Sequence, residues 1–127
     1  PWQHVLDLIE GYRLLLERCL ETNRGDLGQA WNFGPSREDA VTVATLIARL
    51  QDRWKPIALD LREGPPETKI LAINAEKSRK ILGWRPRLYF DGMIDATVEW
   101  YRVALQTPDE LPALTRAQIE HYETLGA

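Results

Sequence analysis

The chain has a single cysteine, Cys19, so it cannot form an internal disulfide, and this fits a protein of a reducing compartment. It has no run of about 18 apolar residues, which excludes an ordinary transmembrane helix. It also lacks a basic excess, because 16 Lys and Arg are set against 19 Asp and Glu. We therefore expect a cytoplasmic protein whose partner is neither a membrane nor a nucleic acid.

Metal ligands and clustered glycines are scarce as well. His4, His121 and Cys19 are the only soft ligands, and they fall on different predicted elements, so we expect no metal site. A dinucleotide-binding loop needs clustered glycines between a strand and a helix. The best candidate pair, Gly25 and Gly28, follows a predicted helix instead. We expect no cofactor site within this chain.

The chain does contain enough apolar sequence for a folded core. Its 127 residues, 44% of them hydrophobic, correspond to one domain or a piece of one. The sequence begins with Pro1 rather than Met and shows no signal peptide, which predicts that it was cut from a longer protein.

The first helix is predicted to end before the loop at residues 23–28. The apolar residues that recur at helical spacing are Val5, Ile9, Tyr12, Leu16 and Leu20, with Leu8, Leu15 and Cys19 beside them, so this helix is expected to need neighbours on two sides. Residues 14–16 are three consecutive leucines, so the apolar surface is wider than the band of about 100° that a surface helix needs. We expect part of this surface to face another part of the complete protein.

The stretch from residue 67 to 86 combines several structural signals. Residues 69–73 are rich in aliphatic side chains and predict a short strand. Asn74 is the expected N-cap of a helix over residues 75–82, and Gly83 is expected to end that helix. The large ring of Trp84, just beyond the helix end, is expected to pack back onto the domain.

Further elements follow the same logic. We expect short strands at residues 30–33 and 57–61, and a helix from an N-cap at Thr42 to Trp54. Asp91 is the expected N-cap of the next helix, followed by a linker at residues 106–112. Thr115 and Gln118 have the spacing of a capping box for the last helix. The sequence therefore predicts one mixed α/β, helix-rich unit over residues 1–127, with short strands and about five helices.

The stretch ETKILAINAEKSRKILGWRP at residues 67–86 resembles the C-terminal region of the extended short-chain dehydrogenase/reductase family, whose members are nucleotide-sugar epimerases and dehydratases. Within that family, three further segments are similar to the CDP-glucose 4,6-dehydratases: PWQHVLDLIEGYRLLLE, NFGPSREDA and LTRAQIEHYETL. The resemblance implies the substrate-binding portion of an NAD-dependent lyase. Such an enzyme converts CDP-glucose to CDP-4-keto-6-deoxyglucose for carbohydrate biosynthesis, for example of O-antigen.

The resemblance also implies what lies elsewhere. The complete enzyme carries a Rossmann domain that holds NAD upstream of this region, and it is a homo-oligomer. The family's catalytic Tyr-x-x-x-Lys is missing, because Leu16, Met93, Leu105 and Gly126 stand four residues after the four tyrosines. We therefore expect no catalytic residue in this chain and no activity of the chain alone.

Four residues are the candidates for contact with the nucleotide sugar, each implied by position in the family: Gln3, His4, Arg62 and Glu67. The family places an arginine immediately before the segment that begins at Pro1, where a guanidinium could grip phosphate in a bidentate way. Alternatively, Gln3 is solvated, and Arg62 and Glu67 are ordinary charges on a loop. Trp2 is expected in the core.

Another class of function remains open. The chain is alternatively a free-standing, non-catalytic domain that binds a ligand or a partner, which would explain the missing catalytic groups without truncation. Within the first class, an epimerase or another dehydratase is possible, and the sequence leaves the nucleotide open.

Overall fold

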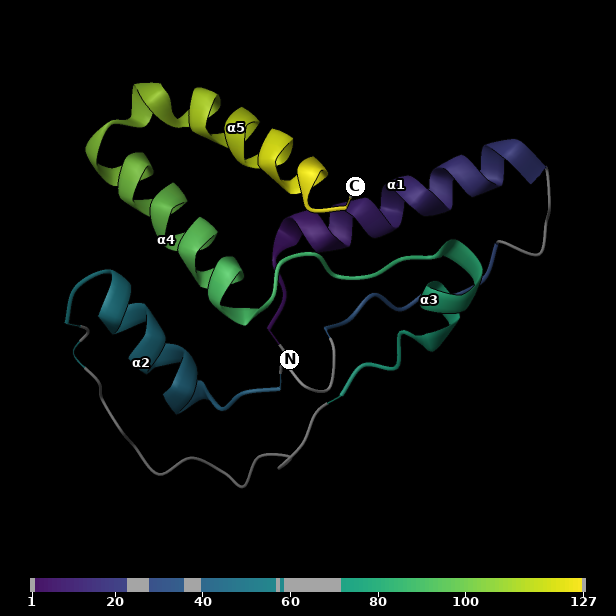
Figure 1. Ribbon diagram of the computed structural model, residues 1–127, viewed down its shortest axis with the longest axis horizontal. Helices are drawn as coiled ribbons and strands as arrows, with labels where there is room; N and C mark the ends of the chain where they lie inside the picture. The colour runs from purple at the N-terminus through teal and green to yellow at the C-terminus, as the bar shows by residue number, and fades with distance from the viewer. Residues whose placement is uncertain (1, 23–27, 36–39, 57, 59–71, 127) are drawn as a thin grey trace.

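The computed structural model describes residues 2–22, 28–35, 40–56, 58 and 72–126. Their helices are α1 (Val5–Thr22), α2 (Val43–Arg53), α3 (Glu76–Leu82), α4 (Phe90–Gln106), the 3-10 helix η3 (Pro108–Glu110) and α5 (Leu111–Thr124). α4 packs between α2 and α5, while α1 extends away from these three helices and contacts α3 (Figure 1). Among the described residues, no helix is long and apolar enough to cross a membrane.

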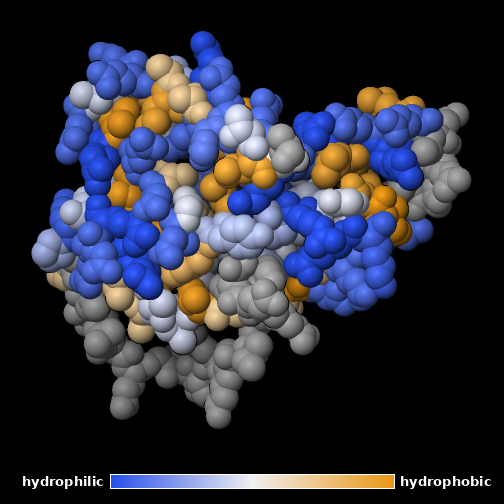
Figure 2. Space-filling view, in the orientation of Figure 1, coloured by the Kyte–Doolittle hydropathy of each residue, from blue (hydrophilic) through white to orange (hydrophobic). Residues whose placement is uncertain are grey.

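The apolar surface predicted for α1 is divided between the core and solvent. The inward face of α1 carries acids, since Asp7 is fully buried and Glu10 is 8% exposed. An apolar stripe on the other side is exposed, with exposed fractions of 58% at Val5, 52% at Ile9, 51% at Tyr12, 63% at Leu16 and 86% at Leu20. Figure 2 shows apolar side chains at the surface of the arm that contains α1. Periodicity identified the apolar stripe, but it could not tell on which side of the helix the core lies. The breadth of the apolar surface was predicted, whereas its division between core and solvent was not.

α3 begins and ends with the predicted side chains. The N–H of Glu76, the first residue of the helix, donates to Asn74 Oδ1 over 2.9 Å, as predicted, but the N-cap position is Ala75, one residue later than predicted. Gly83 ends the helix in the left-handed region, with φ at 69°. A side chain at that φ would be strained, which explains why glycine stands there.

Trp84 forms the centre of one small core. It is fully buried, as expected, and stands with Phe33 and Ala75, while Leu14 of α1 packs against the cluster from outside. The rings of Phe33 and Trp84 meet edge to face, with centroids 5.3 Å apart. Trp84 Nε1 donates to the carbonyl oxygen of Asp7 over 2.8 Å. This core holds α1 against the segment that follows α3.

A second core joins α2 to α4. Its buried residues are Met93, Ile94 and Val98 of α4, against which Leu46, Leu50, Trp54 and Trp2, among others, pack. Thr42 caps α2 as predicted, because its Oγ1 accepts the N–H of Thr45 over 3.1 Å. Asp91 does not cap α4, which begins at Phe90. Asp91 pairs with Arg53 of α2 over 2.9 Å instead, so that prediction was wrong.

The capping box at Thr115 and Gln118 is also wrong. α5 begins at Leu111, after the 3-10 helix, so both residues lie inside the helix. Thr115 Oγ1 donates to the carbonyl oxygen of Leu111 over 2.9 Å, as a mid-helix threonine does. Pro112 in the first turn was the better start signal, because proline is favoured where a helix N–H has no partner.

The predicted strands are not present among the described residues with which they can be compared. Residues 30–33 form no strand, and Phe33 instead turns its ring toward Trp84. Most of the strands expected at 57–61 and 69–73 lies outside the described residues, and Ala58, Ala72 and Ile73 are not in a strand. In the part of the chain that the structure describes, the fold is therefore helix-rich, and its α/β character remains a prediction.

Candidate functional site

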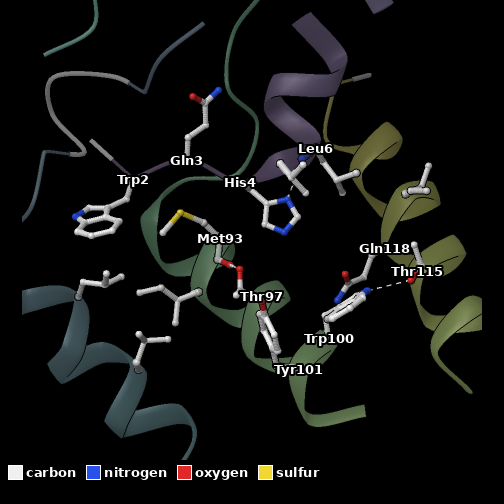
Figure 3. A pocket seen from close by; sticks show the side chains of 15 residues that line it. Trp2, Gln3, His4, Leu6, Met93, Thr97, Trp100, Tyr101, Thr115 and Gln118 are labelled. Carbon is white, nitrogen blue, oxygen red and sulfur yellow. Dashed lines mark hydrogen bonds between the residues drawn. The ribbon is translucent and has the colours of Figure 1, made fainter. Parts of the chain in front are cut away.

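The N-terminal segment, with the candidates Gln3 and His4, lies beside a pocket of about 510 Å³ (Figure 3). Its walls come from α1, α2, α4 and α5. The volume falls within the usual range of small-molecule sites, about 300–1,000 Å³. The described lining residues are mainly aliphatic and aromatic, and none is Lys, Arg, Asp or Glu. The site can therefore receive an uncharged, largely apolar group.

His4 presents a polar atom to this pocket. The ring is only 8% exposed, and its Nδ1 accepts the N–H of Leu6 over 3.2 Å. Burial lowers the pKa of His4 below its ordinary value, and the charge of Asp7 opposes that shift. The neutral ring then carries its proton on Nε2, which faces the pocket (Figure 3). His4 is thus a neutral hydrogen-bond donor to whatever fills the pocket.

Gln3 and Trp2 differ from His4. The side chain of Gln3 points away from the pocket centre (Figure 3), and its Nε2 is buried without a hydrogen-bond partner among the described residues. Trp2 packs against the α4 core, and its Nε1 donates to the carbonyl oxygen of Val41 over 3.2 Å. The prediction of a core Trp2 is confirmed. Both Gln3 and His4 line the pocket, but only the ring of His4 is turned toward its centre.

Three other polar groups of the wall already have partners. Thr97 Oγ1 donates to the carbonyl oxygen of Met93 over 2.7 Å. Trp100 Nε1 donates to Thr115 Oγ1 over 3.0 Å, and Gln118 Nε2 donates to the carbonyl oxygen of Ala96 over 3.0 Å. These groups close the wall between α4 and α5. The His4 ring, by contrast, turns its Nε2 toward the pocket.

Arg62 and Glu67 lie outside the described residues. Their candidate roles as contacts of the substrate remain predictions. Among the described residues, no group of three or more His, Cys, Asp or Glu could hold a metal ion.

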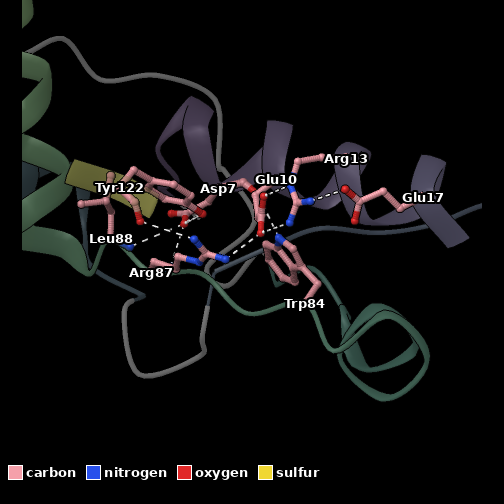
Figure 4. Close-up of polar contacts among 8 residues, drawn as sticks. All are labelled: Asp7, Glu10, Arg13, Glu17, Trp84, Arg87, Leu88 and Tyr122. Atoms are coloured by element: carbon pink, nitrogen blue, oxygen red, sulfur yellow. Dashed lines mark hydrogen bonds and ion pairs between the residues drawn. The ribbon is translucent and has the colours of Figure 1, made fainter. Parts of the chain in front are cut away.

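A second polar cluster joins the two ends of the chain (Figure 4). Asp7 Oδ1 accepts the N–H of Arg87 over 2.7 Å and the hydroxyl of Tyr122 over 2.8 Å. Asp7 Oδ2 is buried and has no partner among the described residues. Burial, with the hydrogen bond to Asp7, raises the pKa of Tyr122. Asp7 therefore ties α1 to the segment before α4 and to α5.

Glu10 continues this cluster along α1. Its Oε1 accepts from Arg87 Nη2 over 2.7 Å, and its Oε2 accepts from Arg13 Nε over 2.7 Å (Figure 4). The hydrogen bond from Arg13 is the main cause that lowers the pKa of Glu10. The guanidinium of Arg87 also lies over the ring of Tyr122, 5.0 Å from its centroid. Glu10 is thus paired with two guanidinium groups, whereas Asp7 is hydrogen-bonded through Oδ1.

The sequence analysis did not identify this cluster. Asp7 stands between two leucines in a helix of apolar character. That position was the sequence feature that could have indicated a buried acid. An acid between apolar neighbours is costly to bury without partners, so its presence implies partners from elsewhere in the fold. The cluster faces the interior and joins α1, Arg87 and α5, so its role is structural.

Comparison with known proteins shows homology to bacterial nucleotide-sugar dehydratases. The CDP-glucose 4,6-dehydratase of Salmonella typhimurium is 33% identical over 114 residues, which is 87% of this chain and 32% of that enzyme. The dTDP-glucose 4,6-dehydratase 1 of Escherichia coli is 34% identical over 85 residues, 61% of this chain and 24% of the enzyme.

A third relative is more distant. The dTDP-glucose 4,6-dehydratase of Xanthomonas campestris pv. campestris is 30% identical over 111 residues, 79% of this chain and 30% of that enzyme. No family model matches the chain. The chain spans about a third or less of the length of these relatives. The resemblance found in the sequence motifs is confirmed.

Proposed function

We propose that this chain, a homologue of the bacterial nucleotide-sugar 4,6-dehydratases, is the part of such an enzyme that binds the nucleotide sugar. The observation that carries the proposal is the homology to CDP-glucose 4,6-dehydratase, which extends over 87% of the chain. The matches to dTDP-glucose enzymes cover 61% and 79% of it. CDP-glucose is therefore the proposed substrate, to be converted to CDP-4-keto-6-deoxyglucose by the complete enzyme.

The pocket beside His4 supports a binding role. Its aromatic and aliphatic walls suit one face of a sugar or base, and the His4 Nε2–H suits a hydroxyl or carbonyl oxygen. A nucleotide sugar also carries a diphosphate, and the described lining residues hold no cation for it. We assign the uncharged end of the substrate to this pocket. The diphosphate is assigned to the loop of Arg62 and Glu67 and to the arginine that the resemblance implies before Pro1.

NAD does not fit the described residues. A dinucleotide site requires glycines that leave space for the pyrophosphate at the start of a helix. Gly11 lies within α1 and faces the Phe33 ring, Gly34 faces Ile73, and Gly83 ends a helix. We place NAD, the catalytic residues and the Rossmann domain in the remainder of the complete enzyme. The homo-oligomer implied by the family is likewise a property of that complete enzyme.

The alternative is a free-standing domain that binds a partner or ligand. The exposed apolar face of α1 favours it, since such faces are often interaction surfaces. The reading frame upstream of Pro1 separates the two. A glycine-rich strand–turn–helix and a Tyr-x-x-x-Lys there support the enzyme, whereas a start codon directly before Pro1 supports the free-standing domain.

The experiment that tests the proposal compares nucleotide sugars. The complete polypeptide that contains this chain is incubated with CDP-glucose or dTDP-glucose, with NAD supplied, and the 4-keto-6-deoxy product is followed. We expect turnover of CDP-glucose at a higher kcat/KM than that of dTDP-glucose, and no turnover by residues 1–127 alone. Failure of the complete polypeptide to act on either substrate would overturn the proposal.

A further inference from the structure

The buried cluster of Asp7, Arg87 and Tyr122 adjoins the histidine that faces the pocket. The backbone N–H of Asp7 donates to the carbonyl oxygen of His4 over 3.2 Å at the start of α1. Burial lowers the pKa of His4 and the charge of the Asp7 carboxylate opposes that shift, so the carboxylate is close enough to act on the ring. The cluster therefore lies next to His4, although its own three residues do not line the pocket.

The direction of the His4 ring is set by the start of α1. Its Nδ1 accepts the N–H of Leu6 over 3.2 Å, and the first N–H groups of a helix have no partner within the helix. The ring thus acts as a capping side chain. Because Nδ1 is the acceptor, Nε2 carries the proton, and Nε2 faces the pocket (Figure 3). A shift of the first turn of α1 would therefore move the Nε2–H relative to the pocket.

Asp7 fixes this first turn to the walls of the pocket. Its Oδ1 accepts the Tyr122 hydroxyl of α5 over 2.8 Å and the backbone N–H of Arg87, just before α4, over 2.7 Å (Figure 4). α4 and α5 both contribute to the walls of the pocket. Both hydrogen bonds end on one carboxylate oxygen, three positions after His4, and so hold the start of α1 against both helices.

The other contacts of α1 hold it to a different part of the fold. Leu8 and Leu14 pack against the core around Trp84, and Trp84 Nε1 donates to the carbonyl oxygen of Asp7 over 2.8 Å. These contacts join α1 to α3 and to the segment that follows α3, neither of which lines the pocket. The position of His4 relative to α4 and α5 therefore depends on the directional hydrogen bonds to the Asp7 carboxylate.

We propose that Asp7 and Tyr122 are positioning residues, whose hydrogen bond aims the His4 Nε2–H into the pocket. The effect on a nucleotide sugar rests on the proposed function, whereas the orientation of the ring does not. Because the two residues act through His4, loss of their bond can weaken binding by no more than loss of the His4 hydrogen bond does. For a neutral hydrogen bond, this limit is about 2- to 10-fold in kcat/KM.

Nuclear magnetic resonance of the histidine rings tests the positioning directly. The complete polypeptide is labelled with heavy nitrogen in histidine and measured at about pH 8, where the rings are neutral, and His4→Gln identifies the His4 signals. In the parent, Nδ1 should have the chemical shift of an unprotonated nitrogen and Nε2 that of a protonated one. In Tyr122→Phe, both shifts should move toward the average of the two tautomers, as in a solvated ring. Phe33→Leu weakens the core around Trp84 instead, so it controls for a general loss of stability and should leave both shifts unchanged.

Kinetics with CDP-glucose give a second readout. Tyr122→Phe should lower kcat/KM by about 2- to 10-fold, mainly through KM, but by less than about 1.5-fold in a His4→Leu background. An equal loss in both backgrounds, or no loss in either, would show that Tyr122 does not act through His4 and would overturn the proposal.

His4 nitrogen shifts that Tyr122→Phe leaves unaltered would overturn it as well. Should Tyr122→Phe not fold, Asp7→Asn replaces it, because a neutral acceptor weakens the same hydrogen bond. If the complete polypeptide acts on neither nucleotide sugar, the proposed function fails, while the nitrogen shifts still decide whether Asp7 and Tyr122 position His4.

Discussion

Tyr122 donates a hydrogen bond to Asp7 over 2.8 Å and so joins the last helix to the first across 115 positions of the chain. Both side chains are buried, with exposed fractions of 4% and 0%. The same carboxylate accepts the backbone N–H of Arg87. Asp7 is therefore the residue through which α1, the segment before α4 and α5 are held together.

Loss of this hydroxyl should destabilise the fold. Tyr122→Phe leaves a buried Asp7 oxygen with one partner fewer, so we expect the free energy of unfolding to fall by about 1–3 kcal/mol. Tyr89→Phe is the control, because Tyr89 is 68% exposed and should change stability by less than about 0.5 kcal/mol. Urea unfolding followed by circular dichroism measures both. Equal stability of the two variants would show that the bond between Tyr122 and Asp7 is unimportant.

Replacing Gly11 of α1 and Gly92 of α4 by alanine should change the stability of the fold in opposite directions. A β-carbon at Gly11 would stand 2.6 Å from Phe33 Cε1, so Gly11→Ala should cost about 1–3 kcal/mol despite its better helix propensity. At Gly92 the nearest atom, Leu88 Cδ2, lies 3.5 Å away, so Gly92→Ala should gain up to about 1 kcal/mol. The urea midpoints of the two variants, compared with that of the parent chain, measure both changes. A Gly11→Ala variant as stable as Gly92→Ala would contradict the close packing of α1 on Phe33.

Stability should depend on pH through His4. Burial lowers the pKa of His4 in the folded state, so the unfolded chain binds this proton more readily. The contribution of His4 is therefore present above the unfolded pKa, about 6.5, and is lost as pH falls toward the lower folded pKa. The slope for one proton is at most about 1.4 kcal/mol per pH unit.

Substitutions of the two histidines show whether His4 causes this dependence of stability on pH. His4→Gln should flatten the loss of stability below about pH 6.5, whereas His121→Gln, at an exposed site on α5, should leave it unchanged. Glu10 does not interfere, because its pKa is lowered and its protonation therefore affects stability at a lower pH than that of His4. Urea midpoints at pH 8, 6 and 5 give the slopes. An unaltered slope in His4→Gln would contradict a buried, neutral His4.

The exposed stripe of α1 should make residues 1–127 bind a hydrophobic dye. Leu16→Glu should reduce dye fluorescence and leave stability within about 0.5 kcal/mol, because Leu16 is 63% exposed. Leu14→Glu should instead unfold the chain, because Leu14 packs against the core of Phe33, Ala75 and Trp84. Dye fluorescence and circular dichroism distinguish the two. A dye-silent parent chain would contradict an uncovered apolar stripe.

Features that depend on residues close together in the sequence could be predicted from it. Thr42, Asn74 and Gly83 act as predicted, because each meets the needs of backbone groups within a few residues of itself. Trp84 was also predicted to pack back onto the domain, since a large ring beyond a helix end rarely stays in water.

Features that depend on residues far apart in the sequence could not be predicted. The core side of α1 is decided by Asp7, whose partners Arg87 and Tyr122 lie at least 80 positions away. Thr115 has the spacing of a cap, but the helix start at Leu111 removed that role. In the site, both Gln3 and His4 line the pocket, and their contact with the substrate stays a prediction. Position in the family could not show that the Gln3 side chain points away from the pocket centre, because side-chain orientation depends on three-dimensional packing.

The most direct test of a substrate-binding role is kinetic and uses the complete polypeptide. His4→Leu removes the Nε2–H that faces the pocket, and His121→Leu is the matched control on an exposed part of α5. Loss of one neutral hydrogen bond should lower kcat/KM for CDP-glucose by about 2- to 10-fold in His4→Leu, mainly through KM. The control should remain within about 1.5-fold of the parent, as expected of a surface change. Identical kcat/KM values for both variants would contradict the assignment of this pocket to the nucleotide sugar.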